Sequence, residues 1–78
     1  MTNAEFADAV GCHHSMASRL RAGKRIPSAG LLARIVEAFP LTQEDTARMF
    51  EALQEEDAAQ AFGRWLSDTV FDRAPAAA

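Results

Sequence analysis

The most restrictive feature of the chain is a glycine, Gly11, that follows an apolar stretch and has an alanine, Ala7, four residues before it. Glycine adopts positive φ at little cost and commonly ends a helix, so Gly11 predicts a tight turn between two short helices. Ala7 leaves only a methyl group where two steeply crossing helices would approach most closely. Apolar residues on both sides of the turn would bury the inner faces of the two helices: Phe6, Val10, Cys12, Ala17 and Leu20. Residues 3–22 are therefore predicted to form a packed pair of helices.

Capping signals predict where these two helices begin and end. Thr2 and Glu5 have the spacing of a capping box, which predicts a helix from near the N-terminus to Val10. The second helix is expected over about 14–22, with Gly23 as its C-terminal stop. Its outward positions are all polar.

A loop and a third helix follow. Pro27 disfavours a helical conformation at the residue before it, and Ser28 is a good N-cap, so residues 23–28 are expected to form a loop. The next apolar positions have the spacing of an amphipathic helix, which Pro40 would end; they are Leu31, Leu32, Ile35, Val36 and Phe39.

The second half of the chain predicts two more helices. Thr42 and Asp45 offer a second capping arrangement, and the helix they open should turn three side chains inward: Met49, Phe50 and Leu53. The polar run at 54–57 should break the chain, and a final helix should start at about Ala58, slightly weakened by Gly63. No segment alternates with a period of two. The predicted fold is all-α with about five helices.

The charge of the chain is divided unevenly. The formal net charge is −3, but residues 1–39 hold five basic and three acidic side chains, whereas residues 40–78 hold three basic and eight acidic ones. The stretch 12–28 contains two histidines, no acidic residue and four basic ones: Arg19, Arg21, Lys24 and Arg25. This layout predicts a basic patch on an acidic body, which can bind phosphate on one side and repel it elsewhere.

Size and composition limit the class of protein. Seventy-eight residues suffice for one hydrophobic core, so a single globular domain is expected, with 1–39 and 40–73 as its two parts and a disordered tail at 74–78. No apolar run is long enough for a membrane span, and the single cysteine fits a reducing compartment. We expect a cytoplasmic protein of a bacterial or phage-infected cell.

Residues 3–39 resemble the Cro/CI, or XRE-type, family of helix-turn-helix repressors. The resemblance is carried by the stretch GCHHSMASRLRAGKRIPS at 11–28, including the pair Ser18-Arg19, Gly23 and the pair Pro27-Ser28. It implies a lambda-repressor-like core whose second helix enters the major groove of DNA. The small size, without a ligand-binding or cleavage domain, is most similar to a phage Cro-type repressor.

The chain departs from the family pattern at three places. Family members usually have a further helix before the first one seen here, and Met1 leaves no room for it. Cys12 and His13 stand where an aliphatic residue and a Ser or Thr cap are usual, and Arg21 stands where an acid is common. The C-terminal helices are the candidates to cover the surface that the missing helix would cover.

The resemblance also implies the DNA contacts. Base-reading residues would be His13, His14, Ser15, Ser18 and Arg19. Of these, Arg19 is the best candidate for a bidentate contact with guanine. Phosphate contacts would come from Asn3, Lys24 and Arg25, whereas Arg21 could equally be a solvated charge.

The C-terminal apolar residues have two interpretations. They could fill the core or form a dimer interface, and both could hold; they are Phe62, Trp65, Leu66, Val70 and Phe71. A dimer is expected because one short helix contacts only a few base pairs.

The sequence gives little support for catalysis or for metal binding. The carboxylates within 44–57 are expected on an exposed face, and no nucleophile–base pair or phosphate loop is present. Adjacent residues at 12–14 cannot all reach one metal ion, and Cys12 is expected to be a small buried residue. We expect no enzyme activity, cofactor, metal, membrane or small-molecule ligand.

Four functions remain open from the sequence. The first is a homodimeric repressor on a pseudo-palindromic operator. The second is an antitoxin whose acidic C-terminal half binds a basic toxin. The others are an activator and a purely protein-binding helical module with a vestigial DNA-binding motif.

Overall fold

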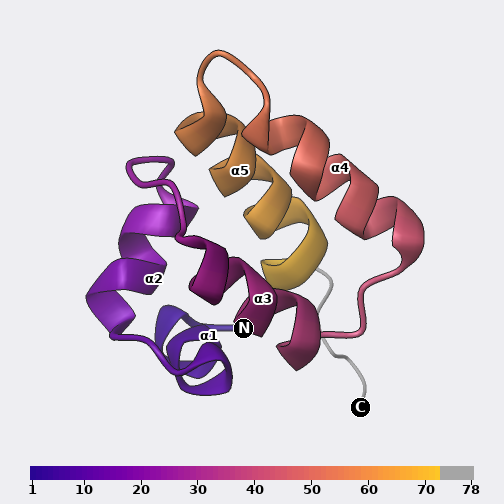
Figure 1. Ribbon diagram of the computed structural model, residues 1–78. Coiled ribbons are helices and arrows are strands. Elements are labelled where there is room, and N and C mark those ends of the chain that lie inside the picture. The colour runs from indigo at the N-terminus through magenta and orange to yellow at the C-terminus, as the bar shows by residue number, and fades with distance from the viewer. Residues whose placement is uncertain (73–78) are drawn as a thin grey trace.

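Short capped helices make up the computed structural model, which describes residues 1–72 (Figure 1). The elements are α1 (Asn3–Val10), α2 (His14–Arg21), α3 (Ala29–Ala38), α4 (Gln43–Leu53), α5 (Ala58–Leu66) and a π-helical turn, η1 (Ser67–Phe71). Within the described residues there is no strand, so the predicted all-α fold of five helices is confirmed. The tail predicted at 74–78 lies outside the described residues.

The predicted capping box starts α1. The Glu5 backbone nitrogen donates to Thr2 Oγ1 at 3.1 Å, and the Thr2 nitrogen donates to Glu5 Oε1 at 2.7 Å. The hydrogen bond from the Thr2 backbone lowers the pKa of the Glu5 carboxyl, so the box is intact while this group is ionised. Gly11 ends the helix with φ of 72°, in the left-handed region that the turn was predicted to require.

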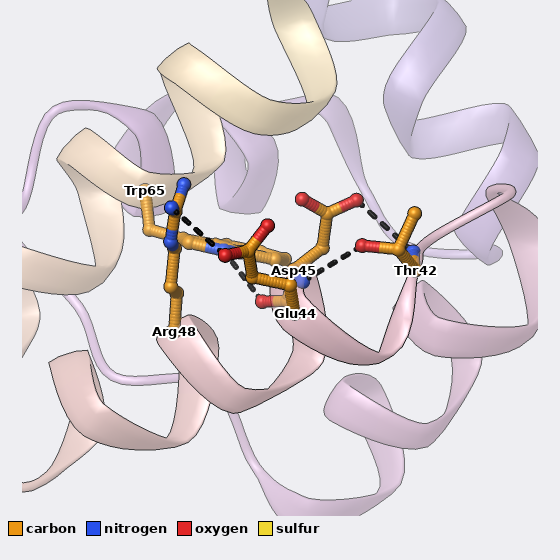
Figure 2. A network of polar contacts seen from close by, with 5 residues as sticks. All are labelled: Thr42, Glu44, Asp45, Arg48 and Trp65. Carbon is orange, nitrogen blue, oxygen red and sulfur yellow. Dashed lines mark hydrogen bonds and ion pairs between the residues drawn. The ribbon is translucent and has the colours of Figure 1, made fainter.

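A second capping box starts α4 and also connects it to α5. The Asp45 nitrogen donates to Thr42 Oγ1, and the Thr42 nitrogen donates to Asp45 Oδ2, both at 3.0 Å. Trp65 of α5 reaches across and donates its Nε1 proton to the Asp45 carbonyl at 3.0 Å (Figure 2). Asp45 is buried, so the expectation that all carboxylates within 44–57 lie on an exposed face is wrong at this position.

The core joins all five helices. The largest fully buried side chains are Phe6, Leu20, Ile35, Met49, Phe62 and Leu66. The Phe6 ring stacks between Phe39 and Phe71, with centroids at 5.7 and 5.2 Å. The C-terminal segment therefore packs directly on α1.

Two side chains on the predicted inward faces of their helices are not buried. Phe50 is 53% exposed and Val36 is 37% exposed. Both lie on the facing sides of α3 and α4, where the helices leave an open groove that no other element of residues 1–72 fills. Amphipathic spacing identified the correct helix face, but it could not show that the space between the faces stays open.

Helix α5 packs on the C-terminal end of α2 through two glycines. A Cβ atom placed on Gly63 would lie 2.9 Å from both the Gly23 nitrogen and the Leu20 carbonyl oxygen. A side chain larger than hydrogen does not fit there without a backbone shift. The glycine that weakens α5 as a helix is thus what lets this helix support α2.

Within residues 1–72, no helix is both long enough and apolar enough to cross a membrane.

Candidate nucleic-acid interface

Helix α2 presents a polar face to solvent and an apolar face to the core. Ala17 and Leu20 have no exposed surface and anchor the inner side. The outer side carries His14, Ser18 and Arg19, all exposed, at the positions predicted to read bases. A short helix with such a face, firmly held from behind, has the arrangement with which recognition helices enter the major groove.

The N-terminus of α2 is capped by His13, a role that the sequence did not reveal. The Ser15 backbone nitrogen donates to His13 Nδ1 at 3.1 Å, and Ser15 Oγ lies 2.8 Å from the same atom. Because Nδ1 accepts the backbone hydrogen bond, the imidazole carries its proton on Nε2 and the Ser15 hydroxyl donates. The His13 and His14 rings stack with centroids 4.4 Å apart.

This cap changes how His13 and Ser15 can act. His13 occupies the cap position where Ser or Thr is usual, and the structure shows that imidazole can replace the hydroxyl there. The Ser15 hydroxyl and one ring nitrogen of His13 are engaged with each other. Only the Nε2 edge of His13 remains for a base or phosphate, so His14, Ser18 and Arg19 have the freest polar groups on this face.

The C-terminus of α2 fixes the basic loop. The Lys24 nitrogen donates to the Arg19 carbonyl at 2.9 Å and the Gly23 nitrogen donates to the Leu20 carbonyl at 3.1 Å, with Gly23 at φ of 77°. These are the two hydrogen bonds of a Schellman motif. They hold Lys24 and Arg25, both exposed, directly beyond the recognition face.

Two predicted phosphate contacts are brought together at the other edge. Arg21 Nη1 lies 3.5 Å from Asn3 Oδ1, at the N-terminus of α1. The Arg21 guanidinium also lies over the Phe71 ring, 4.2 Å from its centroid, in cation–π geometry. Arg21 is therefore not a freely solvated charge. Its guanidinium contacts Asn3 and the ring of Phe71 in the C-terminal segment.

Arg34 is a basic residue near this surface that was not among the predicted DNA contacts. Its Nη1 lies 3.5 Å from the Gly11 carbonyl oxygen, so α3 places a cation beside the turn. No local signal marks it, because the contact joins residues 23 positions apart.

Cys12 is half-buried rather than fully buried. Burial raises the pKa of its thiol. Within residues 1–72, no three His, Cys, Asp or Glu side chains form a group that could hold a metal ion.

The five C-terminal apolar residues lie inside a single chain. Their exposed fractions are at most 7%, for Phe62, Trp65, Leu66, Val70 and Phe71. The structure therefore places them in the core of the single chain, where they leave almost no surface for the dimer interface that was their second predicted role.

The acidic residues of α4 lie away from α2. The stretch 37–57 holds seven acidic side chains and one basic one, Arg48, whose Nη2 lies 3.3 Å from Glu44 Oε2. In Figure 1, α2 and α4 lie on opposite sides of the molecule, with α3 and α5 between them. The acidic side chains of α4 are thus separated in space from the polar face of α2, whereas residues 55–57 precede the start of α5, where Ala59 and Gln60 lie beside Gly23.

Comparison with known protein families decides the identity of this fold. The helix-turn-helix family matches residues 1–46, which cover α1, α2, α3 and the start of α4. The chain belongs to the helix-turn-helix family, of the Cro/CI (XRE) type. This family match supports a DNA-binding transcription regulator. Comparison with curated proteins and with solved structures gives no significant match.

Proposed function

We propose that this helix-turn-helix protein is a transcriptional repressor that binds a pseudo-palindromic operator as a homodimer. The observation that carries the proposal is the exposed polar face of α2, continued by the basic loop that the Schellman motif holds in place. No acidic side chain interrupts this surface between residues 12 and 28. The close contact of Gly63 in α5 with Gly23 and Leu20 supports this surface from behind.

Each basic residue has a distinct role in the proposal. Arg19, on the exposed face, donates two hydrogen bonds to guanine O6 and N7. Lys24 and Arg25 bind phosphates on one side of the groove and fix the register without reading sequence. Asn3 and Arg21 bind a phosphate at the other side, near the positive end of the α1 dipole.

Two copies are required by the size of α2. Eight residues span about 12 Å of helix axis, which covers only a few base pairs. A two-fold pair doubles the contact and requires half-sites about 34–36 Å apart. A bound pair would repress by occluding a promoter that overlaps the operator.

The substitution Arg19→Ala tests base reading. On a duplex recovered by selection from a random library, we expect binding to weaken roughly 5- to 150-fold, with discrimination lost at one base position of each half-site. Fluorescence anisotropy against single-base variants of the duplex measures both effects. Arg48→Ala is the matched control, because Arg48 is an exposed arginine of α4, a helix on the opposite side of the molecule from α2. Equal weakening on every base variant would show that Arg19 binds phosphate instead.

The substitution Lys24→Ala tests phosphate binding. We expect weaker binding to all sequences alike, and a slope of log K against log salt that is shallower by about one unit, because one fewer counterion is released. The same anisotropy titrations at several salt concentrations give this slope. An unchanged slope would remove Lys24 from the phosphate contacts.

A further inference from the structure

The cap of α2 is a histidine, and this residue type makes the start of the helix depend on protonation. An N-cap side chain has to accept a hydrogen bond from the backbone of the first turn, which Ser, Thr and Asn do through an oxygen atom that does not titrate. At His13 the acceptor is the imidazole Nδ1, which receives the Ser15 backbone N–H at 3.1 Å. Both ring nitrogens of a charged imidazole carry hydrogen and can only donate. The cap of α2 therefore exists only while His13 is neutral.

The Ser15 hydroxyl does not replace the acceptor that protonation removes. Its Oγ lies 2.8 Å from His13 Nδ1, and a hydroxyl can rotate to accept from a protonated ring as well as donate to a neutral one. The Ser15 backbone N–H would then face another N–H donor, and the first amides of a helix have no partner within the helix. Protonation thus keeps the contact between the two side chains but removes the hydrogen bond that caps α2.

A positive charge on the ring would also meet an unfavourable field. His13 lies at the N-terminus of α2, where the helix dipole is positive, and the first turn of α2 has no acidic residue. From α3, Arg34 Nη1 lies 3.5 Å from the carbonyl oxygen of Gly11, which precedes His13 by two residues. The His14 ring stacks on the His13 ring with centroids 4.4 Å apart, so two protonated rings would repel each other. These surroundings act in the same direction as the geometry of the cap.

The elements packed on α2 bring no carboxylate to the ring. In α1, Asp8 is the acidic residue of the last turn, and it is exposed. Within residues 1–72, neither histidine forms an ion pair. Helix α5 packs on the other end of α2, at Leu20 and Gly23. The remaining titratable groups of the turn and of these two helices are Cys12, Glu5, whose carboxylate caps α1, and Arg64.

From these observations we propose that His13 is a positioning residue of α2, whose neutral imidazole holds the first turn of the helix and whose protonation releases it. That turn carries His14 and Ser15, two of the residues predicted to read bases. The consequence for DNA rests on the proposed function: release of the first turn weakens specific binding as the pH falls. A histidine that binds phosphate as a cation has the opposite effect, because acid then strengthens binding.

The first test uses the free, full-length protein labelled with ¹⁵N. Long-range ¹H–¹⁵N spectra distinguish the neutral tautomers of histidine, and at about pH 8 we expect hydrogen on Nε2 of His13 and none on Nδ1. The substitution His14→Gln leaves His13 as the only histidine of the chain. Its matched control is the double variant His13→Asn/His14→Gln, in which the asparagine Oδ1 accepts the backbone hydrogen bond at every pH.

Urea unfolding of the two variants measures the effect of the proton. The folded state loses its cap when His13 is protonated and the unfolded state has no cap to lose, so this stabilisation is present at high pH and lost as the pH falls. From about pH 8 to about pH 5, an ordinary histidine gains its proton. Over this interval we expect the unfolding equilibrium constant of His14→Gln to rise about 2- to 30-fold more than that of the double variant.

The second test measures binding to a duplex recovered by selection from a random library. Over the same pH interval, the dissociation constant of His14→Gln should rise about 2- to 30-fold more than that of the double variant. The two proteins differ only at position 13, so effects of the other titratable groups cancel. Wild type and His13→Asn give the same comparison with His14 present. His13→Ala has no cap at any pH and should already bind more weakly at about pH 8.

Three results would overturn the proposal. One is hydrogen on Nδ1 of His13 at about pH 8, which would show that this atom is not the acceptor. Another is an unfolding equilibrium that responds equally to pH in His14→Gln and in the double variant. The third is binding to DNA that strengthens with acid in His14→Gln relative to the double variant, which would show that His13 binds DNA as a cation. The first two results come from the free protein, whereas failure of the proposed function appears as a lack of specific binding at every pH.

Discussion

Replacement of Trp65 by alanine is expected to unfold a large fraction of the protein near physiological temperature. The side chain is 7% exposed, packs against Phe62 with centroids 5.5 Å apart, and donates to the Asp45 carbonyl. Truncation of a buried tryptophan typically costs about 3–5 kcal/mol. A domain of this length has a free energy of unfolding of roughly 4–12 kcal/mol. The loss therefore removes much or all of the stability.

Thermal and urea unfolding followed by circular dichroism measure this effect, with Trp65→Phe as the matched control. Phenylalanine keeps most of the ring but leaves the Asp45 carbonyl without its Trp65 partner, so we expect a loss of about 1–3 kcal/mol (Figure 2). Unchanged unfolding of Trp65→Ala, together with a shift from dimer to monomer in sedimentation, would contradict the core position and restore the interface interpretation.

The substitution Gly63→Ala is expected to destabilise the protein although alanine favours helices. Its Cβ would lie 2.9 Å from two backbone atoms of the segment that ends α2, and neither atom belongs to a flexible side chain. Relief of this overlap requires α5 to move away from α2, at a cost of about 1–3 kcal/mol. Because α5 supports α2, the proposed recognition helix, we also expect weaker binding to the proposed operator.

Gly30→Ala is the control for this substitution. Gly30 lies in the first turn of α3, and a Cβ there would have no neighbour within 4 Å. Alanine should therefore leave the stability unchanged or raise it by up to about 1 kcal/mol, because it has the higher helix propensity. Equal changes in the urea midpoints of the two variants would show that the α2–α5 contact is not as close as the structure has it.

Local signals in the sequence predicted the helices well. Thr2, Ser28 and Thr42 cap α1, α3 and α4, and in each case the side-chain oxygen accepts from the backbone three residues later. Gly11 has the positive φ that its position required. These features depend on residues within one turn of each other, and a linear sequence displays such relations directly.

Contacts between distant segments could not be predicted in the same way. The spacing of Phe50 and Val36 indicates an inward face, but the crossing of α3 and α4 determines how much of that face is covered. The sequence marks Gly63 only as a weak helix former. It gives no sign that Gly63 lies against Gly23, which is 40 residues earlier in the chain.

In the candidate site, too, the features set by nearby residues were predictable and those set by distant residues were not. The polar outer face of α2 and the basic loop follow from helical spacing around Arg19 and Lys24. The His13 cap could have been suspected, because His13 stands where a Ser or Thr cap is usual in the family. The contact of Arg21 with Phe71 had no signal, since the two residues are 50 positions apart in sequence and only the packing of η1 on α1 brings them together.

The central claim is that α2 reads a specific DNA sequence, and selection of bound duplexes from a random library tests it most directly. The purified protein is equilibrated with the library in excess competitor DNA at near-physiological salt, and the bound fraction is sequenced over several rounds. We predict enrichment of one two-fold symmetric motif whose half-sites are centred about 10 base pairs apart, or a multiple of this. Bound fractions that stay as random as the starting library would contradict the account.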